Sequence, residues 1–297
     1  MRVKFLIIVA FLLIVAGCDD DKASSNNQTN NTNNTNTNNI NNTNSNNTNN
    51  INNTNTNNTN NTNNINPADI VADHTIISEF EYIPNAYIQD IIDNFNIYYG
   101  HTSHGSQLIT GAEMLQSETY DFASVNITEP GGDLGHNGDL TWETTTRAYL
   151  AEHPETNLVI WSWCGGVSDN TADGIQIYLD AMNQLELDFP DIIFVYMTGH
   201  TDGSGENGIL RTNNRQIRNF CNQNNKILFD FEDIESWDPS GNYYPDISDD
   251  CAWCSSWCES NTCTDCAGSC AHSHCFNCYQ KGKAFWWMLA RIAGWEG

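Results

Sequence analysis

A short loop at residues 100–106 contains the residue types that nucleophilic catalysis needs, in the order Gly-His-Thr-Ser-His-Gly-Ser. The loop follows an apolar stretch that predicts a strand and precedes a stretch with helical spacing. A serine at such a turn can point its hydroxyl into solvent, while the N-terminus of the following helix offers backbone N–H groups to an oxyanion. A serine of this loop, Ser103 or Ser106, could therefore attack a carbonyl carbon. The alternative is that both serines only form the turn and cap the helix.

A serine hydroxyl becomes a useful nucleophile only with a base within hydrogen-bond reach. Two candidate bases, His272 and His274, stand just before an apolar helix predicted from Gln280 onwards. They are far from Ser103 in the sequence, but a doubly wound parallel sheet can bring both places together above its strand ends. The sequence therefore predicts a serine–histidine pair.

The placement of Gly100 to Ser103 after the first predicted strand resembles the SGNH/GDSL hydrolases. The likeness is greatest to a divergent branch of that superfamily, which reads Gly-His-Gln-Ser-Val-Gly at this place. The resemblance implies that Ser103 is the nucleophile and that Gly105 matches the second glycine. It covers most of residues 90–295 by the order of elements, and its specific part is this first loop.

The same resemblance implies where the oxyanion is held. The glycine-rich loop at 129–137 lies where these enzymes place an oxyanion-hole glycine, which makes Gly131 or Gly132 the candidate. The loop at 162–166 lies where the family has Gly-x-Asn-Asp, but its asparagine is missing here. A backbone N–H of Gly165, or of the next glycine, could replace the asparagine.

The choice of base also rests on the resemblance, because the family has Asp-x-x-His before its last helix. Neither His272 nor His274 has an aspartate three residues before it, and Asp265 is the nearest upstream carboxylate that could orient an imidazole. We favour His274 slightly, because Asn277 and Gly282 then fall as in the family's run into the helix.

The resemblance also suggests a substrate class. Relatives often remove acetyl groups from sugars, so we expect an ester substrate and consider an acylated polysaccharide. Exposed rings of Trp161, Trp163 and Tyr243 could stack on sugars. The loop at 198–203 could line the substrate pocket, although its histidine and aspartate could equally fix the loop by local hydrogen bonds.

The elements that must position these residues follow from the apolar pattern. Five short, wholly apolar segments separated by helical ones predict an α/β domain with a doubly wound, flavodoxin-like, five-stranded parallel sheet in three layers. In such a sheet the ligand site lies beyond the carboxyl ends of the strands. The predicted strands are 96–99, 120–125, 158–161, 192–196 and 226–230, and the last helix is 280–293.

Cysteines form a second pattern near the C-terminus, within a predicted insertion at residues 246–278. Ten of the eleven cysteines lie in the expected globular domain, and an even number in an exported chain predicts disulfides rather than zinc bound with His272 and His274. The ten are Cys164, Cys221, Cys251, Cys254, Cys258, Cys263, Cys266, Cys270, Cys275 and Cys278.

The N-terminus predicts export and a lipid anchor. Two basic residues, a short apolar run and Val-Ala-Gly-Cys at 15–18 resemble a bacterial lipoprotein signal peptide with its lipobox, so we expect Cys18 to be acylated; an ordinary signal peptide is the alternative. Residues 19–66, dominated by Asn and Thr, predict a disordered tether. The globular domain is expected at 67–297, facing the periplasm or the cell exterior and held to the membrane by the lipid alone.

The net charge of −26 excludes some partners. Loss of Arg2 and Lys4 with the signal leaves nine basic against 37 acidic residues, a formal charge of −28. Such a surface repels phosphate backbones, so we expect no nucleic-acid partner. We predict a surface-anchored serine esterase that needs no cofactor or metal. The alternative is a non-catalytic lipoprotein on the same fold that binds a ligand or a metal.

Overall fold

The computed structural model describes residues 66–297. The predictions for the signal peptide, for Cys18 and for all but the last residue of the tether lie outside the described residues. Within the described part of the chain, none of the helices combines the length and the apolar character needed to cross a membrane.

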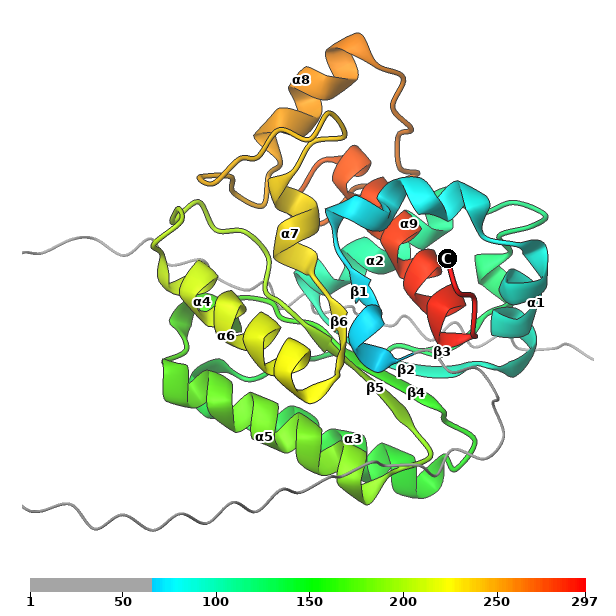
Figure 1. Ribbon diagram of the computed structural model, residues 1–297, viewed down its shortest axis with the longest axis vertical. Helices are drawn as coiled ribbons and strands as arrows, with labels where there is room; N and C mark the ends of the chain where they lie inside the picture. The colour runs from blue at the N-terminus through cyan, green and yellow to red at the C-terminus, as the bar shows by residue number, and fades with distance from the viewer. Residues whose placement is uncertain (1–65) are drawn as a thin grey trace, which may run out of the picture. The chain divides into compact units, whose positions relative to one another are not determined.

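The fold is α/β, as predicted, and is built on a sheet in which every neighbouring pair of strands is parallel (Figure 1). The sheet has six strands in the order β1-β6-β5-β4-β2-β3. Their bounds are Val71–Ala72 (β1), Asn96–Gly100 (β2), Asn126–Thr128 (β3), Leu158–Trp161 (β4), Ile193–Met197 (β5) and Ile227–Phe229 (β6).

Two strands differ from the prediction. The extra strand β1 has only two residues, which is too short for periodicity to reveal, and it pairs with the end of β6. The strand predicted at 120–125 is instead a 3-10 turn, η4 (Phe122–Ser124), and the strand that pairs with β2 begins at Asn126. The physical reason is that Phe122 packs edge-on against Phe285 and Trp286 and so leaves the sheet.

Helices cover both faces of the sheet (Figure 1). One face carries α3 (Thr141–Glu152), α5 (Ala172–Asp188) and α6 (Ile209–Asn224), which contact one another in sequence order. The other face carries α1 (Asn85–Asn94), α2 (Ser106–Met114) and α9 (Cys275–Ile292). The shorter helices are α4 (Gly166–Asp169), α7 (Phe231–Ser236) and α8 (Ala252–Ser260), with 3-10 segments η1 (Pro67–Asp69), η2 (His74–Tyr82), η3 (Ser103–Gly105) and η5 (His136–Gly138).

The helices α2 and α9 approach each other more closely than side chains would allow. A Cβ added to Gly111 would lie 1.9 Å from the backbone oxygen of Cys278, and one added to Gly282 would lie 2.2 Å from the carbonyl carbon of Gly111. Both contacts are with backbone, which cannot swing aside. This pair of glycines therefore fixes α2, which follows the serine loop, against α9, which follows the histidine loop.

The Cys-rich region is disulfide-bonded, as predicted. Eight cysteines form the pairs Cys251–Cys254, Cys258–Cys263, Cys266–Cys275 and Cys270–Cys278. A small core of Ile247, Trp253 and Phe276 accompanies them. Because these thiols are all oxidised, none of the eight remains to bind zinc.

The predicted disulfide role of Cys221 is wrong, because Cys221 is a buried free thiol. It lies near the end of α6, which connects two parallel strands and so ends at the amino-terminal edge of the sheet. Cys164 follows the carboxyl end of β4 at the opposite edge, which excludes a bond between the two. Burial raises the pKa of the Cys221 thiol.

Candidate active site

The predicted nucleophile lies in a strained turn at the carboxyl end of β2. Ser103 has φ of +45°, a left-handed conformation that non-glycine residues rarely adopt. Two hydrogen bonds hold the turn: the Tyr99 hydroxyl donates to the Gly105 carbonyl at 2.7 Å, and the Ser106 hydroxyl donates to the Ser103 carbonyl at 2.7 Å. Ser106 is thus committed to the backbone, whereas the Ser103 hydroxyl faces the histidine loop.

Ser103 and His272, which are 169 residues apart, lie in direct contact. The Oγ of Ser103 is within hydrogen-bond distance of Nε2 of His272. His272 is also left-handed, with φ of +58°, and the Nε2 of Gln107 donates to the preceding carbonyl of Ala271 at 2.5 Å. The disulfide Cys270–Cys278 closes the loop around the histidine. The serine loop and the histidine loop, which are far apart in the sequence, therefore lie side by side in the fold.

The structure places His272, and not the favoured His274, against Ser103. His274 is the N-cap of α9, and its Nδ1 accepts a hydrogen bond from the Phe276 N–H at 3.1 Å. That bond uses a ring nitrogen to satisfy the helix end. The expected orienting carboxylate is also misplaced: in residues 66–297, Asp265 is exposed and makes no hydrogen bond or ion pair.

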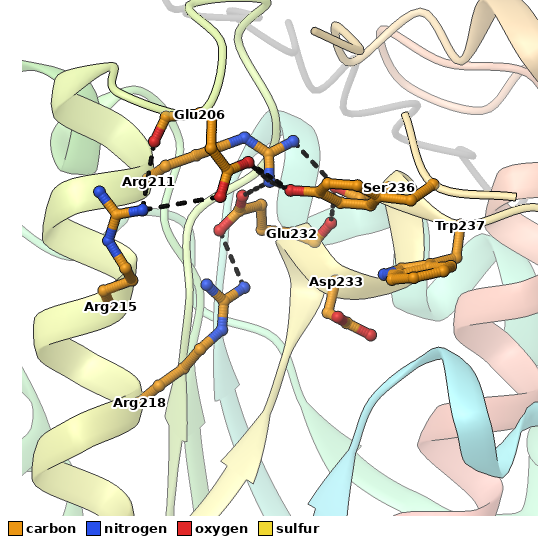
Figure 2. A pocket seen from close by; sticks show the side chains of 9 residues that line it. Glu206, Arg211, Arg215, Arg218, Glu232, Asp233, Ser236 and Trp237 are labelled. Atoms are coloured by element: carbon orange, nitrogen blue, oxygen red, sulfur yellow. Dashed lines mark hydrogen bonds and ion pairs between the residues drawn. The ribbon is translucent and has the colours of Figure 1, made fainter. Parts of the chain in front are cut away.

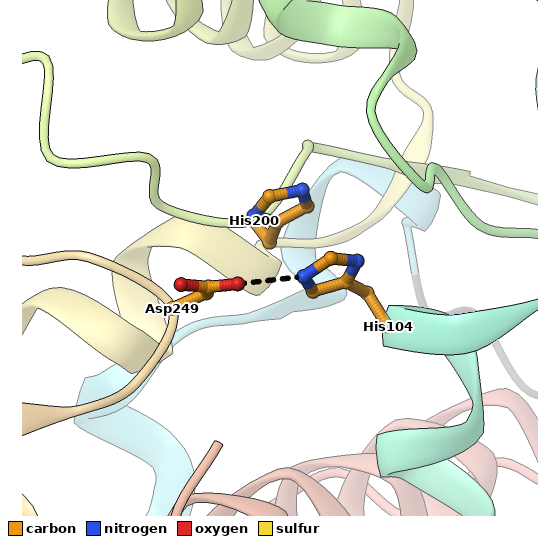
Figure 3. Close-up of side chains that lie close together, drawn as sticks. All are labelled: His104, His200 and Asp249. Atoms are coloured by element: carbon orange, nitrogen blue, oxygen red, sulfur yellow. Dashed lines mark hydrogen bonds and ion pairs between the residues drawn. The ribbon is translucent and has the colours of Figure 1, made fainter. Parts of the chain in front are cut away.

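His272 lies at one end of a stack of three imidazoles, and Figure 3 shows the other two, His104 and His200, with Asp249. The ring of His272 lies 4.3 Å from that of His104, centroid to centroid, and His104 lies 3.5 Å from His200 on its other side. The Nε2 of His104 is 2.9 Å from the Oδ2 of Asp249. Burial lowers the pKa of His104, and the bond to Asp249 offsets this only in part. His104 is therefore neutral at pH 7, and its Nε2–H donates to the carboxylate.

The carboxylate of Asp249 is held in its ionised form. Burial alone would raise its pKa, but hydrogen bonds from His104 and Ser248 prevail and lower the pKa of Asp249 to about 2. A full negative charge therefore lies at the edge of the His104 ring.

The cluster of His104, His200 and Asp249 does not have the geometry of a metal site. Their ligand-type atoms lie within 4.8 Å of one another, but the two histidine rings are only 2° from parallel. Imidazole nitrogens bind metals through lone pairs in the ring plane, and parallel planes do not converge on one ion. An ion between these rings would lie out of both planes.

A buried polar network lies beneath the histidine loop and ties it to the sheet. Lys281, which is fully buried on α9, donates to Glu235 Oε1 at 2.7 Å and also contacts the Gln107 side chain. The other oxygen of Glu235 accepts from the Thr201 N–H at 2.6 Å, next to His200. Burial lowers the pKa of Lys281, and Glu235 opposes that shift. The network fixes both ends of the imidazole stack.

The predicted oxyanion glycines lie on loops that adjoin the serine loop. Gly131 forms a parallel bridge with His101, two residues before Ser103, and a Cβ added to Gly131 would meet no atom within 4 Å. Gly132 has φ of +130°, which favours glycine. Gly165 lies on the neighbouring loop, where an added Cβ would come within 3.5 Å of an exposed imidazole.

Two of the three aromatic residues expected to stack on sugars are buried. Trp161 and Trp163 are 1% and 2% exposed and belong to the core, whereas Tyr243 is 39% exposed. Trp161 packs edge-on against Trp142, and its indole N–H donates to Thr146 Oγ1 at 2.8 Å. Trp161 ends the wholly apolar strand β4, which is buried on both faces, so its ring cannot stack on a sugar.

Tyr243 instead borders a separate pocket of about 320 Å³ between α6 and α7 (Figure 2). Three arginines line it, but they are engaged by neighbouring acids. Arg211 contacts Glu232 at 2.5 Å, and Arg218 reaches Glu232 at 2.8 Å. Arg215 lies 3.7 Å from a carboxylate oxygen at the rim. The pocket is thus largely neutralised by its own ion pairs.

Sequence reasoning missed His104, Asp249 and the buried network. The contact between His104 and Asp249 joins residues 145 positions apart, and no periodicity or spacing marks it. Lys281 did offer a signal, since a lysine within an apolar helix requires a buried partner. The positions of Ser103 and the two histidines were readable because each flanks a predicted element.

Comparison of the chain with known protein families and with curated proteins finds no match.

Proposed function

We propose that this chain is a serine hydrolase of SGNH type that cleaves carboxylic esters. The observation that carries the proposal is the contact between the Ser103 hydroxyl and Nε2 of His272 at the carboxyl edge of a parallel sheet. The five longer strands follow the order β3-β2-β4-β5-β6, which supports the predicted flavodoxin-like winding. The strained conformation of both residues also supports a functional role, because strain concentrates at such sites.

In the first half of the reaction, the Ser103 oxygen attacks the ester carbonyl while Nε2 of His272 takes the hydroxyl proton. The carbonyl electrons move to the oxygen and form a tetrahedral oxyanion. We assign its stabilisation to the backbone N–H of Ser103 and to an N–H of the loop carrying Gly131 and Gly132. The intermediate then collapses: the ester C–O bond breaks, and the alcohol leaves with the proton from His272.

In the second half, His272 removes a proton from water as the water oxygen attacks the acyl-serine. A second tetrahedral intermediate forms on the same oxyanion donors. It collapses to a carboxylic acid, and the Ser103 oxygen recovers its proton from His272. The cycle consumes one ester and one water and needs no metal or cofactor.

We propose an acylated polysaccharide as the substrate class and a lipid-anchored position outside the cytoplasmic membrane. These proposals rest on the SGNH resemblance and on the lipobox ending at Cys18. Metabolic labelling with an alkyne fatty acid tests the anchor, since the label should be lost when Cys18 is replaced by serine. Label that persists in that variant would exclude acylation at Cys18.

The second candidate is a non-catalytic binding protein, favoured by one observation. Asp265, the carboxylate expected to orient the base, is exposed and does not reach His272. A fluorophosphonate separates the two functions because it reacts with an activated serine whatever the substrate is. We expect a single adduct that peptide mass spectrometry maps to Ser103.

Two variants make that labelling decisive. Ser103→Ala should abolish the adduct, whereas Ser106→Ala, which removes a turn hydrogen bond only, should keep it. An unlabelled native protein would favour the binding function, and so would an adduct on another residue.

A further inference from the structure

We propose that His104 and Asp249 are positioning residues that stabilise protonated His272 through the face of its ring. In a Ser-His-Asp site, a carboxylate at Nδ1 of the histidine has this role. The inference rests on the proposed function and names the group that replaces the missing carboxylate.

The charge of Asp249 reaches His272 through the ring of His104. His272 and His104 are stacked with planes 15° from parallel and centroids 4.3 Å apart. His104 is 1% exposed and cannot turn away, because its Nε2 is bonded to Asp249 and its other face lies on His200. Asp249 is itself held by the Ser248 hydroxyl at 3.0 Å. The support of His272 is therefore rigid in its resting position.

The stack favours the charged form of the base for two reasons. A neutral imidazole presents a π face to the imidazolium that forms when His272 takes the serine proton, and such a face attracts a cation. The Asp249 carboxylate accepts the Nε2–H of His104, which increases the electron density of the His104 ring. The carboxylate also adds direct Coulomb attraction one ring away from His272.

The other titratable groups around the stack do not supply that charge. His200 uses its Nδ1–H to donate to the Thr201 carbonyl at 2.8 Å. Glu235 and Lys281, packed beneath from α7 and α9, form an ion pair at 2.7 Å, so their charges largely cancel at a distance. Asp249 is thus the carboxylate whose charge acts on His272 through the stack.

A titration of the resting protein tests the inference without any substrate. The full chain carrying 13C-labelled histidine is titrated by NMR, and the His272 signal is identified by its loss in His272→Gln. In Asp249→Asn the amide oxygen can still accept from His104 while the charge is gone. We expect the His272 midpoint to fall by about half a pH unit or more, as a unit charge one ring away implies.

Asp250→Asn is the matched control, because it removes the same charge from an exposed neighbour. We expect it to shift the titration midpoint of His272 by no more than about a fifth of the shift seen in Asp249→Asn. An unchanged or higher midpoint in Asp249→Asn, with the fold intact by circular dichroism, overturns the inference. So does an equal shift in both variants, which would show a general surface effect.

Two further variants separate the ring from the charge. His104→Phe keeps a stacked ring but loses the bond to Asp249, and His104→Gln can keep the bond without the ring. We expect both to lower the midpoint. On an aryl acetate, the acidic limb of kcat/KM should move to lower pH in Asp249→Asn, together with a lower plateau. A native protein with no turnover would remove the proposed function but leave the NMR result valid.

Discussion

The candidate pair consists of two residues that both pay a conformational cost. Ser103 and His272 have left-handed backbones, a region that residues other than glycine adopt uncommonly, histidine more often than serine. Such conformations cost about 1–3 kcal/mol each and persist only where the surroundings impose them. Here the surroundings are the bond from Gln107 to Ala271 and the closed Cys270–Cys278 loop.

The buried imidazole predicts a pH dependence of stability. The pKa of His104 is lowered by burial from its ordinary value of 6.5, so the unfolded chain binds a proton there before the folded chain does. The contribution of neutral His104 to the free energy of unfolding is therefore complete above pH 6.5 and is lost as the pH falls below that value. We expect the free energy of unfolding to decrease between pH 7 and pH 5, by urea denaturation, and the decrease to be smaller in His104→Phe. An equal slope in both proteins would contradict this assignment.

At the residue scale, the sequence predicted the serine but not its surroundings. Ser103 was identifiable because the loop glycines and the flanking elements mark a turn. The structure places His272, and not the favoured His274, against Ser103. The sequence could not separate the two because a helix-capping histidine and a serine-contacting histidine are the same residue type in the same neighbourhood. The two are separated by tertiary contacts: His272 lies against Ser103, whereas His274 accepts from the Phe276 N–H. Asp249 contacts His104 from 145 positions away and so leaves no local pattern in the sequence.

At the scale of elements, the positions of Ser103 and His272 depend on the contact between α2 and α9. We expect Gly111→Ala to lower the free energy of unfolding by about 1–3 kcal/mol, because its Cβ would overlap the Cys278 carbonyl. The same displacement should move Ser103 away from His272 and reduce fluorophosphonate labelling. Gly268→Ala is the control, since nothing lies within 4 Å of its added Cβ.

Urea denaturation of the two glycine variants at one pH measures this effect. A Gly111→Ala protein as stable and as reactive as the native one would show that the helices can separate at no cost. A Gly268→Ala protein equally destabilised would attribute the effect to alanine rather than to the contact.

The elements themselves were largely predictable, for a physical reason. Strands buried on both faces are short apolar runs, and four of the five predicted ones match β2, β4, β5 and β6 to within two residues. The fifth was placed too early because Phe122, which is apolar, packs against Trp286 of α9 and not within the sheet. The two-residue β1 is defined by pairing with β6 and not by its own sequence.

At the scale of the whole molecule, the net charge of −26 bears on substrate choice. A strongly acidic protein repels an anionic ester during approach, and salt screens that repulsion over about 8–10 Å at moderate ionic strength. We therefore expect kcat/KM for an aryl hemisuccinate to rise several-fold between about 10 and about 500 mM sodium chloride, because the screening length shortens strongly over this range. The neutral aryl acetate should change little. Equal salt dependence for both esters would contradict an electrostatic cause.

Ser103 and His272 are proposed to act as one unit, and initial rates of aryl acetate hydrolysis test this most directly. We expect Ser103→Ala and His272→Asn each to lower kcat by about a thousandfold or more, and the double variant to be no worse, because paired groups fail together. His274→Asn, which keeps a good N-cap, should stay within about threefold of the native rate. Activity that survives in His272→Asn but is lost in His274→Asn would contradict the pairing of Ser103 with His272.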